Sequence, residues 1–118
     1  MDQSQIDRLE ALNNTIRLAH NPNSNMNNGV GYTPIAKWGQ TPLLGTDGIG
    51  ADMWREARTA QFKSHDAGLP LPFGEPLKML AQSAAFASNA LGTRLGVLEQ
   101  GAAADLVVTS YTPATPLD

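Results

Sequence analysis

Three stretches of the chain place apolar residues at the three- and four-residue spacing of an amphipathic helix. The first covers residues 4–12, and the second runs from Met53 to about His65 with Asp52 as its N-cap. The third has Pro76 in its first turn and ends at Gly92. The positions expected to face a core are Ile6, Leu9 and Leu12 in the first helix; Met53, Ala57 and Ala60, with Trp54 and Phe62 as further candidates, in the second; and Leu77, Leu80, Ala84, Ala87 and Leu91 in the third.

Three runs that favour β-strands alternate with these helices. Residues 15–20 stop at Asn21-Pro22, residues 41–45 run into the turn Thr46-Asp47-Gly48, and residues 104–109 follow a glycine-containing turn. The segment 21–31 has five Asn, two Gly and one Pro, which predicts a loop, and residues 32–38 predict a short helix. The order of elements predicts an α/β fold with parallel strands, because parallel neighbours require helical crossovers.

Composition narrows the class of protein. The 118 residues suit one small domain, and the net charge of -3 without a Lys/Arg cluster argues against nucleic acid or an anionic membrane as the partner. Cysteine is absent, so a transition metal would need histidine and carboxylate ligands. The first 20 residues lack the apolar run of a secretory signal and no run of about 18 apolar residues occurs, so we expect a cytoplasmic protein.

Candidate chemistry lies where the first two strands end, since ligands of α/β folds gather at the carboxyl ends of strands. The candidates are His20, Asn25 and Asp47, of which Asp47 would present a carboxylate beside Gly45 and Gly48. Each also has a structural interpretation. Asp47-Gly48 is a common turn signal, His20 can be a strand-end histidine bonded to backbone, and the asparagines can serve turns.

Taken together, these segments resemble a known family. His20-Asn21-Pro22-Asn23-Ser24-Asn25-Met26, followed by Leu44-Gly45-Thr46-Asp47-Gly48, is similar to the last two barrel strands of metal-dependent amidohydrolases. The resemblance is to the cytosine deaminase-like and triazine chlorohydrolase subgroup, above all to aminohydrolases of the SsnA type. Residues 48–58, 95–101, 104–108 and 111–117 extend it over nearly the whole chain from His20 to Leu117.

The resemblance implies a fold. Residues 1–95 would form the C-terminal part of a TIM (β/α)8 barrel, with the equivalents of strands 7 and 8 and their helices, and residues 96–118 would begin the return into a small β-sandwich. Met1 directly before the helix that precedes the seventh strand suggests a truncated reading frame, an internal start or a gene fragment.

The resemblance also implies site residues. In the full-length family a divalent metal, Zn or Fe, is held by four side chains, of which Asp47 matches the eighth-strand aspartate that also takes a proton from the metal-bound water. His20 and Asn25 match the seventh-strand motif and would line the substrate pocket. The family's other metal ligands are histidines, including a His-x-His, but this chain has only His20 and His65. We therefore expect no stable metal binding by this chain alone, because mononuclear sites take about three or more protein ligands.

Two functional hypotheses follow. The first is a segment of a metal-dependent hydrolase that acts on non-peptide C–N bonds of a cyclic nitrogen compound such as a purine, pyrimidine or triazine, inactive by itself. The alternative is a non-catalytic α/β module for structure or subunit interaction, in which open strand edges are covered in a homo-oligomer or by another chain.

Overall fold

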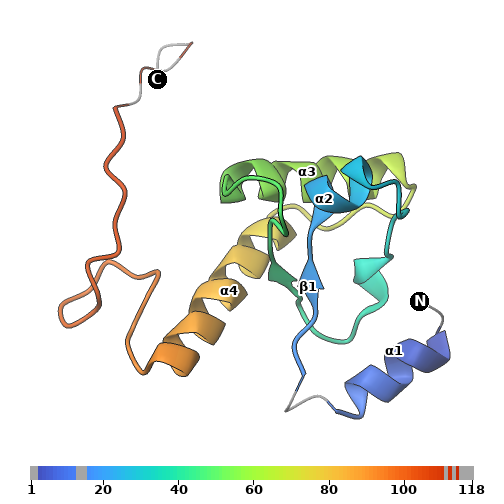
Figure 1. The fold of residues 1–118 in the computed structure, drawn as a ribbon, viewed down its shortest axis with the longest axis horizontal. Helices are drawn as coiled ribbons and strands as arrows, with labels where there is room; N and C mark the ends of the chain where they lie inside the picture. The colour runs from blue at the N-terminus through green and yellow to red at the C-terminus, as the bar shows by residue number, and fades with distance from the viewer. Residues whose placement is uncertain (1–2, 13–15, 111, 113, 115–118) are drawn as a thin grey trace.

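A computed structural model of the chain describes residues 3–12, 16–110, 112 and 114, including the backbone but not the side chains of residues 3 and 10. It folds into helices and two short strands (Figure 1). In chain order the elements are α1 (Gln3–Glu10), β1 (Ala19–His20), α2 (Pro22–Asn27), the 3-10 helix η1 (Ile35–Lys37), β2 (Leu43–Leu44), α3 (Met53–Asp66) and α4 (Glu75–Leu91).

The sheet is parallel, as the sequence predicted. β1 and β2 pair in the register Ala19 with Leu43 and His20 with Leu44. The Leu43 amide donates to Leu18 O at 2.8 Å and the Gly45 amide donates to His20 O at 3.0 Å. Both strands are shorter than expected, and the predicted start of the first, at Thr15, lies outside the described residues. Pairing is confined to the few residues at which the two strands run side by side.

The two long helices begin and end where the sequence signals placed them. Asp52 caps α3, because its Oδ1 accepts the backbone amide of Arg55 at 2.9 Å. Pro76 lies in the first turn of α4, where its missing N–H leaves no helical bond unmade. Gly92 ends α4 with φ 64°, the left-handed conformation that a Cβ disfavours. Capping chemistry therefore predicted both helices.

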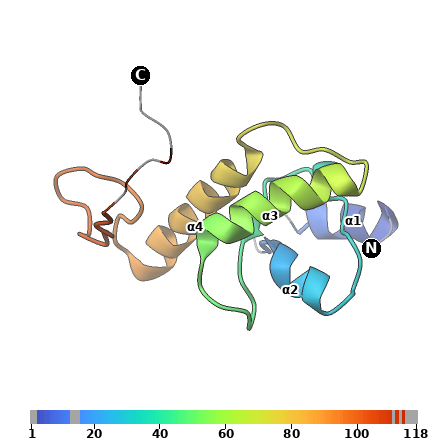
Figure 2. The same ribbon diagram turned by 90° about the horizontal axis from the view of Figure 1, so that it is seen from above.

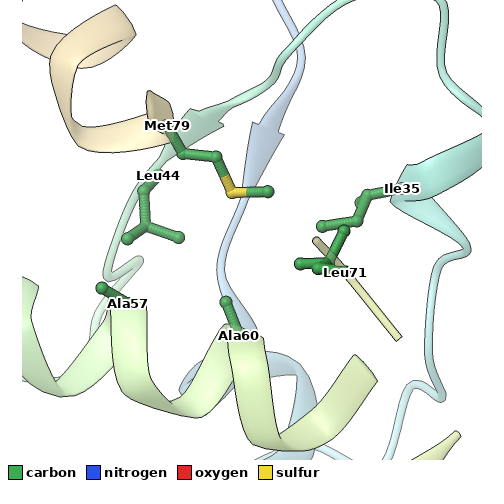
Figure 3. Close-up of a cluster of buried hydrophobic side chains, with 6 residues drawn as sticks. All are labelled: Ile35, Leu44, Ala57, Ala60, Leu71 and Met79. Carbon is green, nitrogen blue, oxygen red and sulfur yellow. The ribbon is translucent and has the colours of Figure 1, made fainter. Parts of the chain in front are cut away.

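A small apolar core holds α3 and α4 against β2. Ala57 and Ala60 of α3 point toward Leu44 and Met79, and Ile35 and Leu71 complete the cluster (Figure 3). The small alanines let α3 approach the strand closely. Ser83 of α4 adds a polar contact, since its hydroxyl accepts the Leu44 amide at 3.1 Å and lies 3.2 Å from Leu44 O.

The faces assigned to the two long helices need correction. Trp54 and Phe62 were candidates for the core side of α3, but they are exposed, and the buried face instead includes Glu56 and Ser64. On α4 the predicted stripe is also wrong at Leu77 and Leu91, which are exposed. The buried face of α4 carries Pro76 and Met79, with Leu80 and Ser83 partly buried. Since α4 is apolar on most sides, its periodicity did not specify one face.

Two further predictions changed. The segment predicted as a loop over 21–31 contains α2, a short helix with Pro22 in its first turn. The strand predicted over 104–109 is absent, and this stretch is extended and exposed. The preceding loop does fold back on α4, because the Leu95 amide donates to Ser88 Oγ at 3.0 Å.

The C-terminal stretch accounts for the open shape of the molecule. It leaves the body of the fold after α4, as Figures 1 and 2 show. The radius of gyration is 16.1 Å, whereas a compact domain of this length has about 13.5 Å. No helix in the described ranges combines the length and apolar character needed to cross a bilayer.

Candidate functional site

The candidate site lies at the carboxyl edge of the sheet. β1 leads through Asn21 directly into α2, and β2 leads through Gly45 and Thr46 to Asp47. Because the strands are parallel, both connections emerge at the same edge. The side chain of Asn21 lies against Gly45, since a Cβ added to Gly45 would clash with Asn21 Oδ1. Glycine at position 45 therefore leaves room for the Asn21 side chain between the two connections.

Asp47 stands in a turn that exposes its carboxylate. The Ile49 amide donates to Thr46 O at 3.2 Å and closes the turn. Asp47 has φ 52°, the left-handed region that Asp and Asn tolerate better than other side chains. The Asp-Gly turn and the exposed carboxylate thus occur together in one element.

One oxygen of the Asp47 carboxylate is held by α2. The Ser24 hydroxyl donates to Asp47 Oδ2 at 2.7 Å, and Ser24 is only 2% exposed. The Asn28 side-chain amide in turn donates to Ser24 Oγ at 3.3 Å. Within the described part of the chain, Oδ1 of Asp47 makes no hydrogen bond. The carboxylate is oriented through one oxygen and available through the other.

A second set of contacts fixes α2 on α3. The backbone amide of Asn23 donates to Glu56 Oε2 at 3.2 Å, and the Thr59 hydroxyl donates to Asn23 Oδ1 at 3.1 Å. Glu56 is 1% exposed, so its carboxylate is removed from water and engages the first turn of α2 instead. Asn23 therefore links α2 and α3 through both its backbone and its side chain.

His20 is buried rather than open to solvent. Its ring meets Tyr32 edge to face, with centroids 6.3 Å apart and an interplanar angle of 87°. Burial lowers the pKa of His20 to about 4, so the ring is neutral near pH 7. Among the described residues, neither His20 Nε2 nor the Tyr32 hydroxyl has a hydrogen-bond partner. His20 pairs with Leu44 in the parallel register of the sheet.

The structure brings together part of the set that the sequence singled out. Asp47 and the segment that contains Asn25 lie at one edge, but Ser24 is the residue that contacts Asp47, while Asn25 is half-buried on α2. The sequence singled out neither Ser24, which contacts Asp47, nor Glu56, which contacts Asn23. Pro22 signalled a first helical turn, and Glu56 lies at helical spacing between Met53 and Ala60, so both signals were present.

At the carboxyl edge of the sheet, the residues that the structure describes offer one suitable metal ligand, Asp47. Among the described residues, no three His, Asp or Glu side chains lie together as a metal site. Asp47 has the hard oxygen donor, the exposure and the free Oδ1 that a divalent cation requires. His20 is buried against Tyr32, so its ring is not exposed as Asp47 is. A metal held through Asp47 needs further ligands from outside this part of the chain.

The chain belongs to the amidohydrolase family. The sequence profile of that family matches residues 1–118. Members of this family generally depend on a metal and have a TIM-barrel-type fold. The described part of this chain is a small α/β fold with helices and two parallel strands.

The chain is similar to curated deaminases. It is 33% identical to a 5'-deoxyadenosine deaminase of Methanosarcina acetivorans over 79% of this chain and 23% of the relative. It is 35% identical to a 5-methylthioadenosine/S-adenosylhomocysteine deaminase of Halothermothrix orenii, over 85% and 25%. A deaminase of the latter name from Pyrococcus furiosus is 31% identical, over 92% and 27%. The chain spans about a quarter of the length of these relatives, and no solved structure matches it.

Proposed function

We propose that this chain provides the last two barrel strands and one metal ligand of an aminohydrolase that cleaves a non-peptide C–N bond in a cyclic nitrogen compound. The observation that carries the proposal is the exposed carboxylate of Asp47, oriented by Ser24 at the carboxyl edge of the sheet in a chain of this family. Residues 1–95 would complete a barrel, and residues 96–118 would begin a β-sandwich once other strands pair with them.

Asp47 would hold a divalent cation, Zn or Fe, through Oδ1. When bound, such an ion supplies the acidity that makes water a nucleophile near neutral pH. The Asp47 carboxylate would also accept a proton, and its hydrogen bond from Ser24 keeps one oxygen fixed while the other acts. The remaining ligands must come from strands that this chain does not supply, so we expect the chain alone to bind metal no better than an ordinary surface carboxylate.

The substrate class follows from the relatives' names. Those relatives are named as deaminases of 5'-deoxyadenosine and of methylthioadenosine or adenosylhomocysteine. Among purines, pyrimidines and triazines, this favours a purine that carries an exocyclic amino group. We assign His20 and Asn25 to the wall of its pocket, where they would contact substrate or support the loop above it, without binding the metal.

A non-catalytic α/β module is the second candidate. It is favoured by the exposed apolar side chains of the C-terminal half, among them Leu91, Leu98 and Val107. Such surface could be covered by a second copy of the chain. A purified chain that runs as a homo-oligomer and gains no activity with added barrel strands would support this candidate instead.

Complementation tests the first proposal. The missing strands, with the His-x-His and the family's remaining histidine ligand, would be expressed as a separate chain and mixed with this one. The pieces should associate, because each covers apolar surface and open strand edges of the other, and deaminase activity toward a 6-aminopurine nucleoside should appear.

Variants at two aspartates then identify the residue that acts. Asp47→Asn should lower kcat of the assembly by about three powers of ten or more, because the nearly isosteric amide is no base and a poorer metal ligand. Asp52→Asn is the matched control and should keep activity, since Asn caps a helix as well as Asp. His20→Ala should lower activity less and keep the metal bound. Near-full activity with Asn at position 47 would refute the assignment.

Calorimetric titration of the isolated chain with Zn²⁺ examines the ligand count. We expect no stoichiometric site of submicromolar affinity, because Asp47 is a single ligand. A tight site that Asp47→Ala removes would show that further ligands are present in this chain, and His20→Ala would then be the next variant to titrate.

A further inference from the structure

We propose that α2 and its C-cap residue Asn28 carry a directional hydrogen-bond relay, Asn27 to Asn28 to Ser24 to Asp47, that positions the Asp47 carboxylate. The inference deepens the proposed function, on which it rests for the role of Asp47 as a metal ligand. Ser24, Asn28 and Asn27 are positioning residues in this proposal, because they act through Asp47.

The direction of the relay follows from the chemistry of its members. A carboxylate only accepts, so the single hydroxyl proton of Ser24 is committed to Asp47 Oδ2 at 2.7 Å. Ser24 Oγ then accepts from Asn28 Nδ2 at 3.3 Å, and Asn28 Oδ1 accepts from Asn27 Nδ2 at 3.2 Å. Each group donates toward the carboxylate, so the bonds polarise one another in the same sense.

Burial determines how much each residue of the relay contributes to holding Asp47. Ser24 is 2% exposed, so water cannot replace its hydroxyl without local opening. Asn27 and Asn28 are exposed, and water can take over part of what their amides supply. The loss on removing each member should therefore be largest at Ser24, smaller at Asn28 and smallest at Asn27.

The helix that carries Ser24 is held in place by α3. Asn23, next to Ser24, is held on α3 by Glu56 and Thr59. α3 itself begins at its Asp52 cap, five residues after Asp47. Both α2, which carries Ser24, and the turn that carries Asp47 are thus attached to α3. Because α2 is held there, Ser24 cannot shift together with Asp47 if the carboxylate moves.

A second buried serine shows what a purely structural hydroxyl looks like. Ser64 is 0% exposed and donates at 2.7 Å, but to the backbone oxygen of Gln61, and it accepts the Leu71 amide at 3.1 Å. Its partners belong to the α3 helix and the following core segment. Ser64→Ala therefore matches Ser24→Ala in burial and lost bond while leaving Asp47 untouched.

Amide hydrogen exchange of the 118-residue chain tests the relay without metal or substrate. The Ile49 amide, bonded to Thr46 O, reports the turn that holds Asp47. Ser24→Ala should speed its exchange about 10- to 100-fold, since a hydrogen bond to a charged group is lost, and Asn28→Ala should speed it less. Ser64→Ala should leave the exchange rate of the Ile49 amide unchanged, once that rate is corrected for any change in global unfolding. Equal Ile49 exchange in the Ser24→Ala and Ser64→Ala chains would overturn the proposal.

The complemented assembly adds a second measurement. Ser24→Ala should lower metal content and kcat at least tenfold with little change in KM, and Ser24→Thr, which keeps a hydroxyl, should restore part of both. An active assembly that Ser24→Ala leaves unchanged would refute the relay. An inactive wild-type assembly together with selective Ile49 exchange would refute the proposed function and leave the relay standing.

Discussion

The carboxyl edge of the sheet and the segment after α4 differ in which side chains are buried. At the edge, polar Ser24 and Glu56 are 2% and 1% exposed, and both are hydrogen-bonded. After α4, apolar Val107 and Val108 are 87% and 97% exposed. The buried polar groups of the first region are hydrogen-bonded within this chain, whereas the apolar side chains of the second are left uncovered by it. Stability should therefore reside in residues 19–83, and the C-terminal stretch should add little to it.

The largest expected difference is between a buried and an exposed side chain of α4, each shortened to alanine. Met79→Ala should lower the free energy of unfolding by about 2–5 kcal/mol, because Met79 is 1% exposed and fills the cluster between α3 and β2. Leu91→Ala, 69% exposed on the same helix, should change it by less than about 0.5 kcal/mol. Urea denaturation measures both. Similar losses for the two variants would contradict the difference between the regions.

Acidification probes the buried side chain of His20. Burial lowers the pKa of His20 from 6.5 to about 4. As the pH falls from about 6.5 to 4 the unfolded chain takes up a proton that the folded chain does not. The free energy of unfolding should therefore drop over this window, by up to about 3 kcal/mol.

Denaturation at a series of pH values, with wild type and His20→Phe, measures that slope. The variant should lose most of it. His65→Gln, which removes the exposed histidine of α3, is the control and should retain it. A slope that persists without His20 would assign the pH dependence to other groups.

A smaller effect is expected at the start of α3. Asp52→Ala removes the side-chain acceptor for the Arg55 amide and should cost about 1 kcal/mol, while Asp52→Asn should cost little. Thermal unfolding followed by circular dichroism compares the two. Equal losses would mean that charge, not capping, is the contribution of Asp52.

The smallest effect is expected in the C-terminal stretch. Val107→Thr and Val108→Thr replace exposed side chains and should leave the free energy of unfolding within about 0.5 kcal/mol of wild type. In the complemented assembly the same substitutions should weaken association, if this stretch pairs with other strands there. Destabilisation of the isolated chain by either variant would show that it already packs against something.

Local chemistry made much of the fold predictable from the sequence. Asp52, Pro76 and Gly92 specified where the two long helices begin or end, because caps depend on neighbouring residues alone. The parallel order of β1 and β2 followed from the helical crossover. The strand predicted over 104–109 was wrong, because a strand needs a neighbouring strand to pair with, and local sequence does not show whether one is present.

The candidate site was predictable only in part, for a similar reason. Asp47 stood out through its flanking glycines and through family resemblance. Ser24 did not, because its importance comes from a contact across 23 residues that no local pattern encodes. The asparagines around it favoured a loop, and a six-residue helix is too short to show periodicity.

The left-handed backbone of Asp47 also bears on how such a sequence changes over generations. At φ 52° glycine would sit without the steric cost, roughly 1 kcal/mol, that a side chain carries there. Selection for folding alone would let position 47 drift toward Gly or Asn, and selection for hydrolysis would keep Asp despite that cost. The distribution of residues at this position in sister lineages would therefore record whether the carboxylate is still in use.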